Sequence, residues 1–337
     1  MTEAPAPPGE PLTFCVVGAG AVGGHIGARL AAAGYSTSEL ARGRTLGALR
    51  QHGWRLDAPD GLMTGPARAS DSSQELGPHD VVVLAVKGPS LPSVAPHLPA
   101  LLHPGTVVVT AVNGVPWWFF QGFGGEYEGL KLGTVDPDGA LAASVPIEHV
   151  LGSVVHFSAS SPEPGVVVNH AGRRLILGEP NGVLSPRVNA VADALRSAGF
   201  EIDVTDAVQR DIWYKLWGNM TMNPVSALTG ATADVILDDE LVRAFCEAVM
   251  REAAAIGTEI GCPIEQSTAD RIVVTRQLGR LRTSMLQDAE AGKPLELDAM
   301  LSAVREIAIA TRTPIPFTEG LLGLTRLNAR IRHLYPW

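Results

Sequence analysis

The segment Gly18-Ala19-Gly20-Ala21-Val22-Gly23 constrains the fold of this chain most strongly, because its three glycines have the spacing GxGxxG. It follows an apolar run at residues 12–17 and opens an alanine-rich stretch at 21–33, so we predict a strand, a tight turn and a helix. The first glycine would form the turn, the second would let a pyrophosphate approach the backbone, and the third would allow close helix–strand packing. The helix N-terminus attracts the anion. We expect a dinucleotide here; a glycine-rich turn without a ligand is the alternative.

The residues after this motif alternate between short strands and helices. Residues 81–86 are apolar throughout, as in a parallel strand covered by helices on both faces, and residues 106–112 repeat that character. A strand at 35–41 and a helix at 45–52 complete the pattern. Together these runs predict a doubly wound, Rossmann-type α/β domain at the N-terminus.

The middle of the chain has a different pattern. Strand-like runs at 150–158, 165–170 and 173–177 are separated by Pro/Gly turns, which predicts an antiparallel extension of the sheet. A helix at 185–198 and a closing strand at 200–204 follow. The aromatic run at residues 117–120 (Trp-Trp-Phe-Phe) forms either a lid or substrate wall, or a contact with the core.

From about residue 205 the pattern changes to long helices. They are expected at 207–222, 239–257, 267–289, 297–311 and 318–334. We therefore predict a disordered tail at 1–11, a dinucleotide-binding Rossmann domain at 12–206, and an all-α domain at 207–337 for substrate binding and dimerisation.

Composition excludes several classes of function. The chain has 337 residues, of which 46% are hydrophobic and 18% charged, as in a compact soluble enzyme. A net charge of −9 without a dense Lys/Arg cluster disfavours nucleic-acid binding. Apolar runs are only of strand length, so no membrane span is expected. The three cysteines lack metal-ligand spacing and the N-terminus lacks a secretory signal, so we predict a cytoplasmic protein with free thiols and no metal.

Polar residues follow three of the predicted parallel strands at their carboxyl ends, where open α/β sheets bind ligands. Arg42 follows the second strand, where an acidic residue would favour NAD and a cation suits the extra phosphate of NADP. Glu39 lies three residues earlier and is expected to point elsewhere. Lys87 and Asn113 follow the next two strands, so we expect both at the edge of the cofactor crevice.

A lysine and two asparagines recur at intervals of four residues in the first predicted helix of the second domain. Lys215, Asn219 and Asn223 therefore rise along nearly one face of this helix, with mostly apolar residues between them. An asparagine amide can accept from an ammonium and also donate to a substrate oxygen. A lysine held in this way is a candidate general acid for a carbonyl group. A polar surface stripe is the alternative.

Two further segments carry polar residues at helical positions. Ser284 and Asp288 lie one helical turn apart, and Glu296 follows Gly292-Lys293-Pro294 at an expected helix start. Considered alone, Glu296 is a first-turn carboxylate stabilised by the helix dipole, and Ser284 is an ordinary helix serine.

Together these motifs resemble the ketopantoate reductase (2-dehydropantoate 2-reductase) family, from about residue 13 to the C-terminus. The resembling segments are the glycine motif, Arg42-Gly43, Val86-Lys87, Asn113-Gly114, Trp213-Tyr214-Lys215-Leu216 with Asn219 and Asn223-Pro224, Ser284 to Asp288, and Glu296-Leu297-Asp298. The resemblance implies an N-terminal Rossmann domain and an all-α C-terminal domain like that of 6-phosphogluconate dehydrogenase. It also implies NADPH as hydride donor to the C2 carbonyl of a 2-oxo acid, with 2-dehydropantoate giving (R)-pantoate as the favoured reaction.

The same resemblance implies a role for each site residue. Lys215 would protonate the developing alkoxide, and Glu296 would bind the lysine or the substrate hydroxyl. Ser284 would bind the substrate carboxylate, while Asn113, Asn219 and Asn223 would orient substrate and lysine. The cofactor would be bound by the glycine motif, Arg42, Lys87 and Asn113.

Three positions depart from the family pattern. Leu281 stands where an asparagine is usual, Leu301-Ser302 where Asn-Gly is usual, and the run 117–120 where smaller or more polar residues are usual. These changes favour a bulkier or less hydroxylated 2-oxo acid as an alternative substrate. A dehydrogenase of 3-hydroxy acids or opines, and a non-enzymatic protein that senses NADP, are further alternatives. A homodimer is compatible with the long apolar helices.

Overall fold

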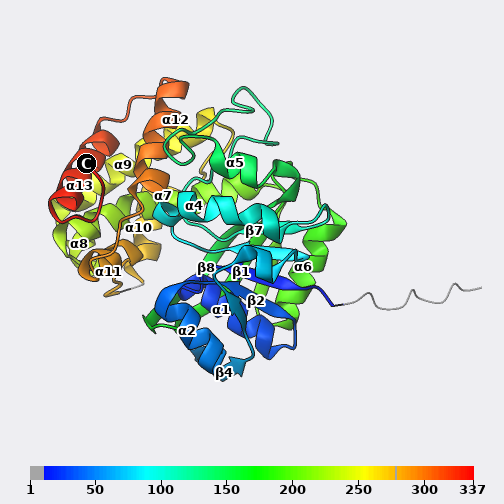
Figure 1. Cartoon of the computed structure of the whole chain (residues 1–337). Helices are drawn as coiled ribbons and strands as arrows, with labels where there is room; N and C mark the ends of the chain where they lie inside the picture. Colours follow the sequence, from blue (N-terminus) through cyan, green and yellow to red (C-terminus); the bar gives the residue numbers. More distant parts are fainter. Residues whose placement is uncertain (1–10, 278) are drawn as a thin grey trace, which may run out of the picture.

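The computed structural model describes residues 11–277 and 279–337, so nearly all of the predicted tail at 1–11 lies outside the described residues. The described residues form one ten-stranded sheet and a group of helices (Figure 1). The strands are β1 (Phe14–Val17), β2 (Thr37–Leu40), β3 (Trp54–Ala58), β4 (Gly61–Gly65), β5 (Arg68–Ser70), β6 (Val81–Leu84), β7 (Val107–Thr110), β8 (Val150–Glu163), β9 (Val166–Gly178) and β10 (Glu201–Val204).

The described helices divide between the two halves of the chain. Those before residue 205 are α1 (Ala21–Ala32), α2 (Gly43–His52), α3 (Ser73–Leu76), α4 (Leu91–Val94), α5 (Ala140–Ser144) and α6 (Pro186–Ser197). Those after it are α7 (Val208–Thr229), α8 (Ala233–Asp238), α9 (Glu240–Glu259), α10 (Thr268–Arg276), α11 (Ser284–Glu290), α12 (Ala303–Thr311) and α13 (Pro316–Ile331), with a π-helical turn at Asp298–Ser302 before α12.

The order of the parallel strands confirms the Rossmann-type fold. From one edge the sheet runs β5-β2-β1-β6-β7-β8, with each neighbouring pair parallel. This is the order 3-2-1-4-5-6 of dinucleotide-binding domains. The carboxyl ends of β1, β6 and β7 therefore lie side by side, which brings the loops that begin at Gly18, Ala85 and Ala111 to one edge of the sheet.

The sheet then continues beyond β8 as an antiparallel extension, as predicted. β8 pairs antiparallel with β9, and the register shifts between His156 and Ser158. The two runs expected at 165–170 and 173–177 are one continuous strand, because the turn residue Gly172 is accommodated within β9. β3 and β4 were missed by the sequence analysis. They form a hairpin whose turn is Pro59-Asp60, followed by Gly61, a turn signal that the sequence does contain, and β3 pairs with β9.

The helical half differs from the prediction at one place. The single helix expected at 267–289 is two helices, α10 and α11, joined by a segment that contains Gly279. Each helix has its own N-cap: the hydroxyl of Ser267 accepts from the backbone of Asp270, and that of Thr283 accepts from Leu286. Two capping residues in one periodic run indicate two helix starts. No helix among the described residues combines the length and apolarity needed to cross a membrane.

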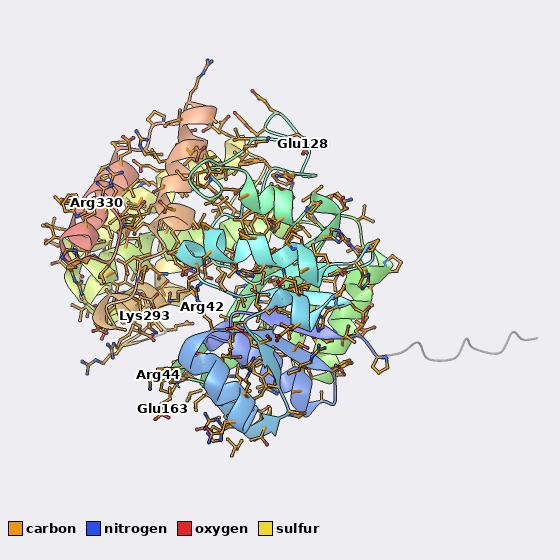
Figure 2. All side chains as sticks on the ribbon, viewed as in Figure 1. Arg42, Arg44, Glu128, Glu163, Lys293 and Arg330 are labelled. Atoms are coloured by element: carbon orange, nitrogen blue, oxygen red, sulfur yellow. The ribbon has the colours of Figure 1, made fainter. Side chains whose placement is uncertain are left out.

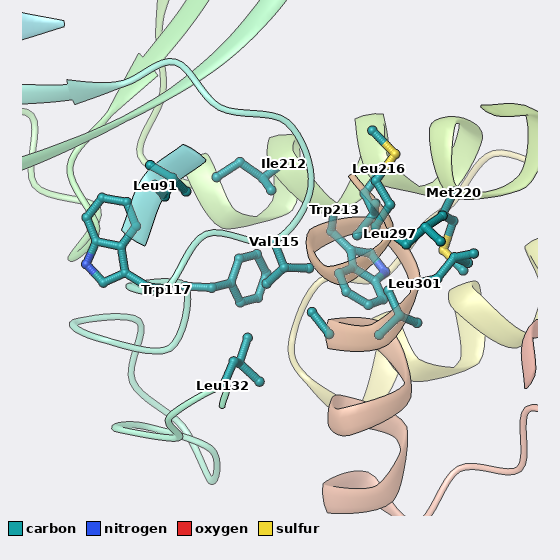
Figure 3. Close-up of a cluster of buried hydrophobic side chains, with 14 of the residues drawn as sticks. Leu91, Val115, Trp117, Leu132, Ile212, Trp213, Leu216, Met220, Leu297 and Leu301 are labelled. Atoms are coloured by element: carbon teal, nitrogen blue, oxygen red, sulfur yellow. The ribbon is translucent and has the colours of Figure 1, made fainter. Parts of the chain in front are cut away.

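The boundary expected near residue 206 falls between two elements, because β10 ends at Val204 and α7 begins at Val208. The domain limits themselves stay a prediction. One hydrophobic cluster extends across this point, and it includes residues of β6 and β7 together with residues of α7, α9 and α12. Figure 3 shows part of this cluster, with Trp117 on the left, Val115 in the middle, and Trp213 and Leu297 on the right.

The aromatic run at 117–120 lies inside this cluster. All four side chains are at most 3% exposed, and the Trp118 indole donates to the Thr110 hydroxyl (3.2 Å). A Cβ placed on Gly152 of β8 would approach the Trp118 ring to 2.6 Å, so the sheet and the indole are in close contact. The alternative of core packing is therefore correct, and the lid or substrate wall is not.

Candidate active site

The glycine loop has the shape that a dinucleotide requires. Gly18 has a φ of +105°, and a Cβ on it would approach Val86 to 2.7 Å. A Cβ on Gly23 would lie 2.2 Å from the Gly18 carbonyl oxygen, so the start of α1 packs directly on the turn. At Gly20, by contrast, a Cβ would meet nothing within 4 Å. The loop is thus tight where strand and helix meet and open where a pyrophosphate would approach, so these residues fit the group.

Glu39 contacts this loop, contrary to the expectation that it points elsewhere. Its side chain is fully buried in β2, and Oε1 accepts from the backbone N–H of Gly18 (3.1 Å). Among the described residues Oε2 has no hydrogen-bond partner. Burial raises the pKa of this carboxyl well above its usual range, against the opposing effect of the backbone N–H groups of Gly18 and Ala19. The sequence indicates this contact only by an acidic residue inside the short strand that lies between the glycine loop and Arg42.

Arg42 and Lys87 occupy the two neighbouring loops. Arg42 is the exposed residue before α2, and Figure 2 shows it at the edge of the N-terminal half that faces the helices around Lys293. The ammonium of Lys87 pairs with Asp288 of α11, a carboxylate from the other half of the chain. The predicted cofactor lysine therefore also links the two halves.

Lys215 and Asn113 meet, although they are far apart in sequence. The ammonium on α7 donates to Oδ1 of Asn113, in the loop after β7, at 2.8 Å. Both residues line a small cavity that is partly open to solvent, together with Asn219. The remaining lining residues are Val112, Gly114, Ser153, Val154, Ile212 and Leu216. The cavity thus has a cation and two carboxamides set among apolar side chains.

The environment of Lys215 prepares it for proton transfer. Burial lowers the pKa of its ammonium from the usual 10.5 to about 8, and the negative charge of Glu296 opposes that shift. A pKa near neutrality is what a general acid needs in order to give up its proton at physiological pH.

Glu296 is buried (7% exposed) at the junction between the two halves. Its Oε1 accepts from the backbone N–H of Gly88, beside Lys87, at 2.9 Å. Burial raises the pKa of this carboxyl, while the Gly88 hydrogen bond and the nearby ammonium groups of Lys87 and Lys215 favour its charged form. The carboxylate therefore acts electrostatically on both lysines.

The π-helical turn that follows Glu296 holds the Asn113 loop in place. The backbone N–H of Val115 donates to the carbonyl of Ala299 (2.8 Å). A Cβ on Gly114, which has a φ of +83°, would lie 2.5 Å from that same carbonyl oxygen. Only glycine fits at this position, and the close contact fixes Asn113 where it meets Lys215.

Two predicted substrate residues lie outside the cavity lining. Asn223 is buried (6% exposed), and its amide contacts the sulfur of Met300 at 3.8 Å. Ser284 is exposed at the first position of α11. Their assigned roles stay predictions.

One residue of β8 lines the cavity and was missed by the sequence analysis. Ser153 lines the cavity, and its hydroxyl donates to the carbonyl of Thr110 (3.1 Å). His156, further along β8, is close enough to Lys215 for that charge to act on its imidazole. Burial lowers the pKa of this imidazole to about 4, and the charges of Lys215, Arg174 and Arg271 add to the shift. Nothing in the spacing of the sequence signals this proximity, because β8 precedes α7 by some fifty residues.

Comparisons with known proteins agree with this arrangement. Residues 14–182 match the family model described as ketopantoate reductase PanE/ApbA, and residues 207–329 match the model of its C-terminal region. The chain belongs to the ketopantoate reductase family. The resemblance inferred from the sequence is thereby confirmed, and so is the two-part fold. The chain is an oxidoreductase that acts on a CH–OH group, and the cofactor of this family is NADPH.

Individual ketopantoate reductases match over nearly the whole chain. The 2-dehydropantoate 2-reductase of Mesorhizobium japonicum is 42% identical, over 96% of this chain and 100% of its own. A solved structure from Ralstonia solanacearum MolK2, assigned as a ketopantoate reductase, is 55% identical with a TM-score of 0.93, over 97% of this chain and 100% of its own. A D-mandelate dehydrogenase solved with NADH and anilino(oxo)acetate is 17% identical with a TM-score of 0.81, over 96% of this chain and 100% of its own, which shows a common fold alone.

Proposed function

We propose that this chain reduces the C2 carbonyl of a 2-oxo acid to a 2-hydroxy acid with NADPH, and that 2-dehydropantoate, giving (R)-pantoate, is its substrate. The observation that carries the proposal is the contact between the Lys215 ammonium and Asn113 in a cavity that Asn219 also lines. Family membership and the name of the Mesorhizobium japonicum relative support the choice of substrate.

Lys215 is the proton donor in this proposal. When a hydride reaches C2, negative charge develops on the carbonyl oxygen, and a nearby ammonium stabilises that charge and then supplies the proton. Asn113 holds the ammonium with its oxygen and keeps its amide N–H groups for the substrate. Asn219, one turn further along α7, lines the same cavity and is placed to orient the carbonyl.

NADPH, when bound, supplies the hydride. The open space above Gly20 supports binding of its pyrophosphate, and the exposed Arg42 at the end of β2 is placed for a 2′-phosphate. Lys87, paired with Asp288 in the adjacent loop, would add positive charge on the same side.

One of the sequence differences that favoured a bulkier substrate does not affect the cavity. The aromatic run at 117–120 packs into the core and does not line the cavity. Leu281 is partly exposed (36%), in the segment between α10 and α11. Leu281 and Leu301-Ser302, the latter in the π-helical turn, therefore remain the two departures that bear on substrate choice. A homodimer and a cytoplasmic location also stay predictions.

The test is oxidation of NADPH and NADH, followed at 340 nm, with 2-dehydropantoate and a panel of other 2-oxo acids. We expect turnover of 2-dehydropantoate with a preference for NADPH, and a loss of about 10²- to 10⁴-fold in kcat for Lys215→Ala. Lys293→Ala, which removes an exposed lysine outside the cavity, is the matched control. Turnover of other 2-oxo acids only would refute the substrate. Nicotinamide binding without turnover of any 2-oxo acid would favour the sensor alternative, and activity restricted to 3-hydroxy acids would favour the other dehydrogenase class.

A further inference from the structure

Two hydrogen bonds hold the chain on either side of Glu296. The backbone N–H of Leu295 donates to the carbonyl of Leu334 (2.9 Å), and the hydroxyl of Tyr335 donates to Oδ1 of Asp298. Both partners come from one short segment that follows α13. Glu296 therefore lies one residue after the first contact and two residues before the second.

The position of Glu296 depends on these contacts, because the chain before it is open to solvent. The residues at 291–294 are exposed. Leu295, Leu297 and Leu334, by contrast, are at most 4% exposed and belong to the shared hydrophobic cluster. Glu296 is thus at the point where the chain enters the core, and the segment after α13 fixes that point.

The contact between Tyr335 and Asp298 gives a role to a residue that the cavity does not use. Asp298 belongs to the sequence segment that resembles the family, but the cavity lining among the described residues does not include it. Burial and the hydrogen bond to Asp298 raise the pKa of the Tyr335 phenol to about 12. The phenol therefore keeps its proton at physiological pH and stays a donor, and a hydrogen bond to a carboxylate is stronger than one between neutral groups.

The turn that begins at Asp298 leads to both groups that act on Lys215. Its next residue is Ala299, whose carbonyl accepts a backbone hydrogen bond from the loop that carries Asn113. Asn113 in turn accepts from the Lys215 ammonium. On the other side of Asp298, the charge of Glu296 favours the protonated form of the same lysine.

We propose that Tyr335 is a positioning residue for the reaction. Its hydroxyl holds Asp298, and the turn that begins there keeps the Glu296 carboxylate and the Asn113 amide where they act on Lys215. A displaced turn weakens the influence of Glu296 on the ammonium, because the interaction of two charges falls with their distance. This assignment rests on the proposed function, and it deepens the account of the same site.

The experiment changes the hydrogen bond from both of its ends. Tyr335→Phe removes the hydroxyl and keeps the ring, and Asp298→Ala removes the acceptor. Asp298→Asn keeps an acceptor oxygen and is the conservative replacement. The matched control is Tyr35→Phe, which removes a tyrosine hydroxyl that contacts the hydroxyl of Ser197 at 2.8 Å, outside the site.

The first measurement is the pKa of Lys215 itself, which requires no turnover. The chain has four lysines, so a protein labelled with ¹³C at the lysine side chains gives few NMR signals, and the Lys215 signal is the one lost in Lys215→Ala. In the wild type this signal should titrate near pH 8. We expect it to titrate at lower pH in Tyr335→Phe and Asp298→Ala, and near the wild-type value in Asp298→Asn and Tyr35→Phe.

A double variant tests whether the effect acts through Glu296. Glu296→Gln removes the charge, so adding Tyr335→Phe to it should not lower the pKa of Lys215 further. Two changes that act through one group are not additive.

The second measurement is turnover of the 2-oxo acid that the wild type reduces best. A small misplacement of catalytic groups can lower a rate by up to about 10²-fold. We expect Tyr335→Phe to lower kcat at pH 7 about 3- to 30-fold by this effect. Asp298→Asn should recover most of the loss seen in Asp298→Ala, and Tyr35→Phe should behave as the wild type.

The possible failures are distinguishable. If the wild type turns over no 2-oxo acid, the proposed function is wrong, whereas the titration of Lys215 still decides whether Tyr335 acts on it. If Lys215 titrates at the same pH in wild type and Tyr335→Phe, or if the shift persists without the charge of Glu296, the assignment of Tyr335 is wrong. A lower unfolding temperature with an unchanged titration would show a structural role alone and would also overturn it. If Tyr335→Phe does not fold, the comparison of Asp298→Ala with Asp298→Asn decides in the same way.

Discussion

Two opposing influences act on the ammonium of Lys215. Burial among the apolar lining of the cavity favours the neutral amine, whereas the charge of Glu296 favours the ammonium, and burial has the larger effect. Asn113 holds the ammonium by its oxygen without adding a charge. The proton on Lys215 is therefore held loosely enough to be transferred near neutral pH.

The pH dependence of the reaction should follow from this balance. The protonated lysine is the active form, so kcat should fall as the pH rises through about 8. Glu296→Gln removes the charge that favours the ammonium. The pKa of Lys215 should then fall further, and the alkaline limb of the profile should move to lower pH. A pH–rate profile of both proteins measures this shift, and a limb that stays in place or moves to higher pH would contradict the model.

Residues of the site differ in how far the sequence predicts them. Lys215 and Asn219 were found because one helix carries both at regular spacing, and Asn113 because it ends a predicted strand. Ser153 was not found, because its place depends on which strand packs against α7. That packing is a tertiary property that no local pattern encodes.

Among the elements, the π-helical turn at Asp298–Ser302 connects the two halves through a backbone hydrogen bond. It begins two residues after Glu296, and its Ala299 carbonyl accepts a hydrogen bond from the backbone N–H of Val115. π-Turns within helices occur often at functional sites, where they shift the direction of a few side chains or carbonyls. Here the carbonyl of Ala299 accepts a hydrogen bond from the loop that carries Asn113.

Gly114→Ala should therefore destabilise the protein beyond the usual penalty for a positive φ. An alanine at φ +83° costs about 1–2 kcal/mol, and contact with the Ala299 carbonyl should add about 1–3 kcal/mol. Gly125→Ala is the matched control, since Gly125 has a φ of +80° but would meet nothing within 4 Å. Urea unfolding gives both free energies of unfolding. Equal losses in the two variants would show that the contact with the turn has no effect.

The elements themselves were predicted to different degrees. Buried parallel strands such as β6 were predicted well, because both of their faces are covered and their sequence is uniformly apolar. The division between α10 and α11 was missed, because the apolar period continues across it while the caps at Ser267 and Thr283 act locally. The hairpin of β3 and β4 was missed because β4 is largely exposed and lacks an apolar face.

In the molecule as a whole, the sheet and the helices pack around one shared hydrophobic core. Leu84 and Val108 from the sheet belong to the same hydrophobic cluster as Trp213 and Leu216 from α7. A second cluster on the other face of the sheet contains Trp54. The predicted boundary near residue 206 thus divides the pattern of the sequence more clearly than it divides the core.

Unfolding should accordingly be cooperative. We expect the urea transitions followed by tryptophan fluorescence and by far-UV circular dichroism to coincide, because four tryptophans (Trp117, Trp118, Trp213 and Trp217) lie in the shared cluster. Trp54→Phe removes the indole of the second cluster and should leave the two curves superimposed. Separate transitions would indicate that the sheet and the helices unfold independently.

The shared core also bears on how the chain is made. A ribosome releases the strands first, and the part of their apolar face that α7 and the later helices cover stays exposed until those helices have left the exit tunnel. Because Glu296 and the turn after it come near the end of translation, a nascent chain holds its glycine loop long before it holds a complete site. During synthesis the growing polypeptide therefore exposes apolar surface and has no complete active site. We expect chaperones that bind nascent chains to bind it at this stage.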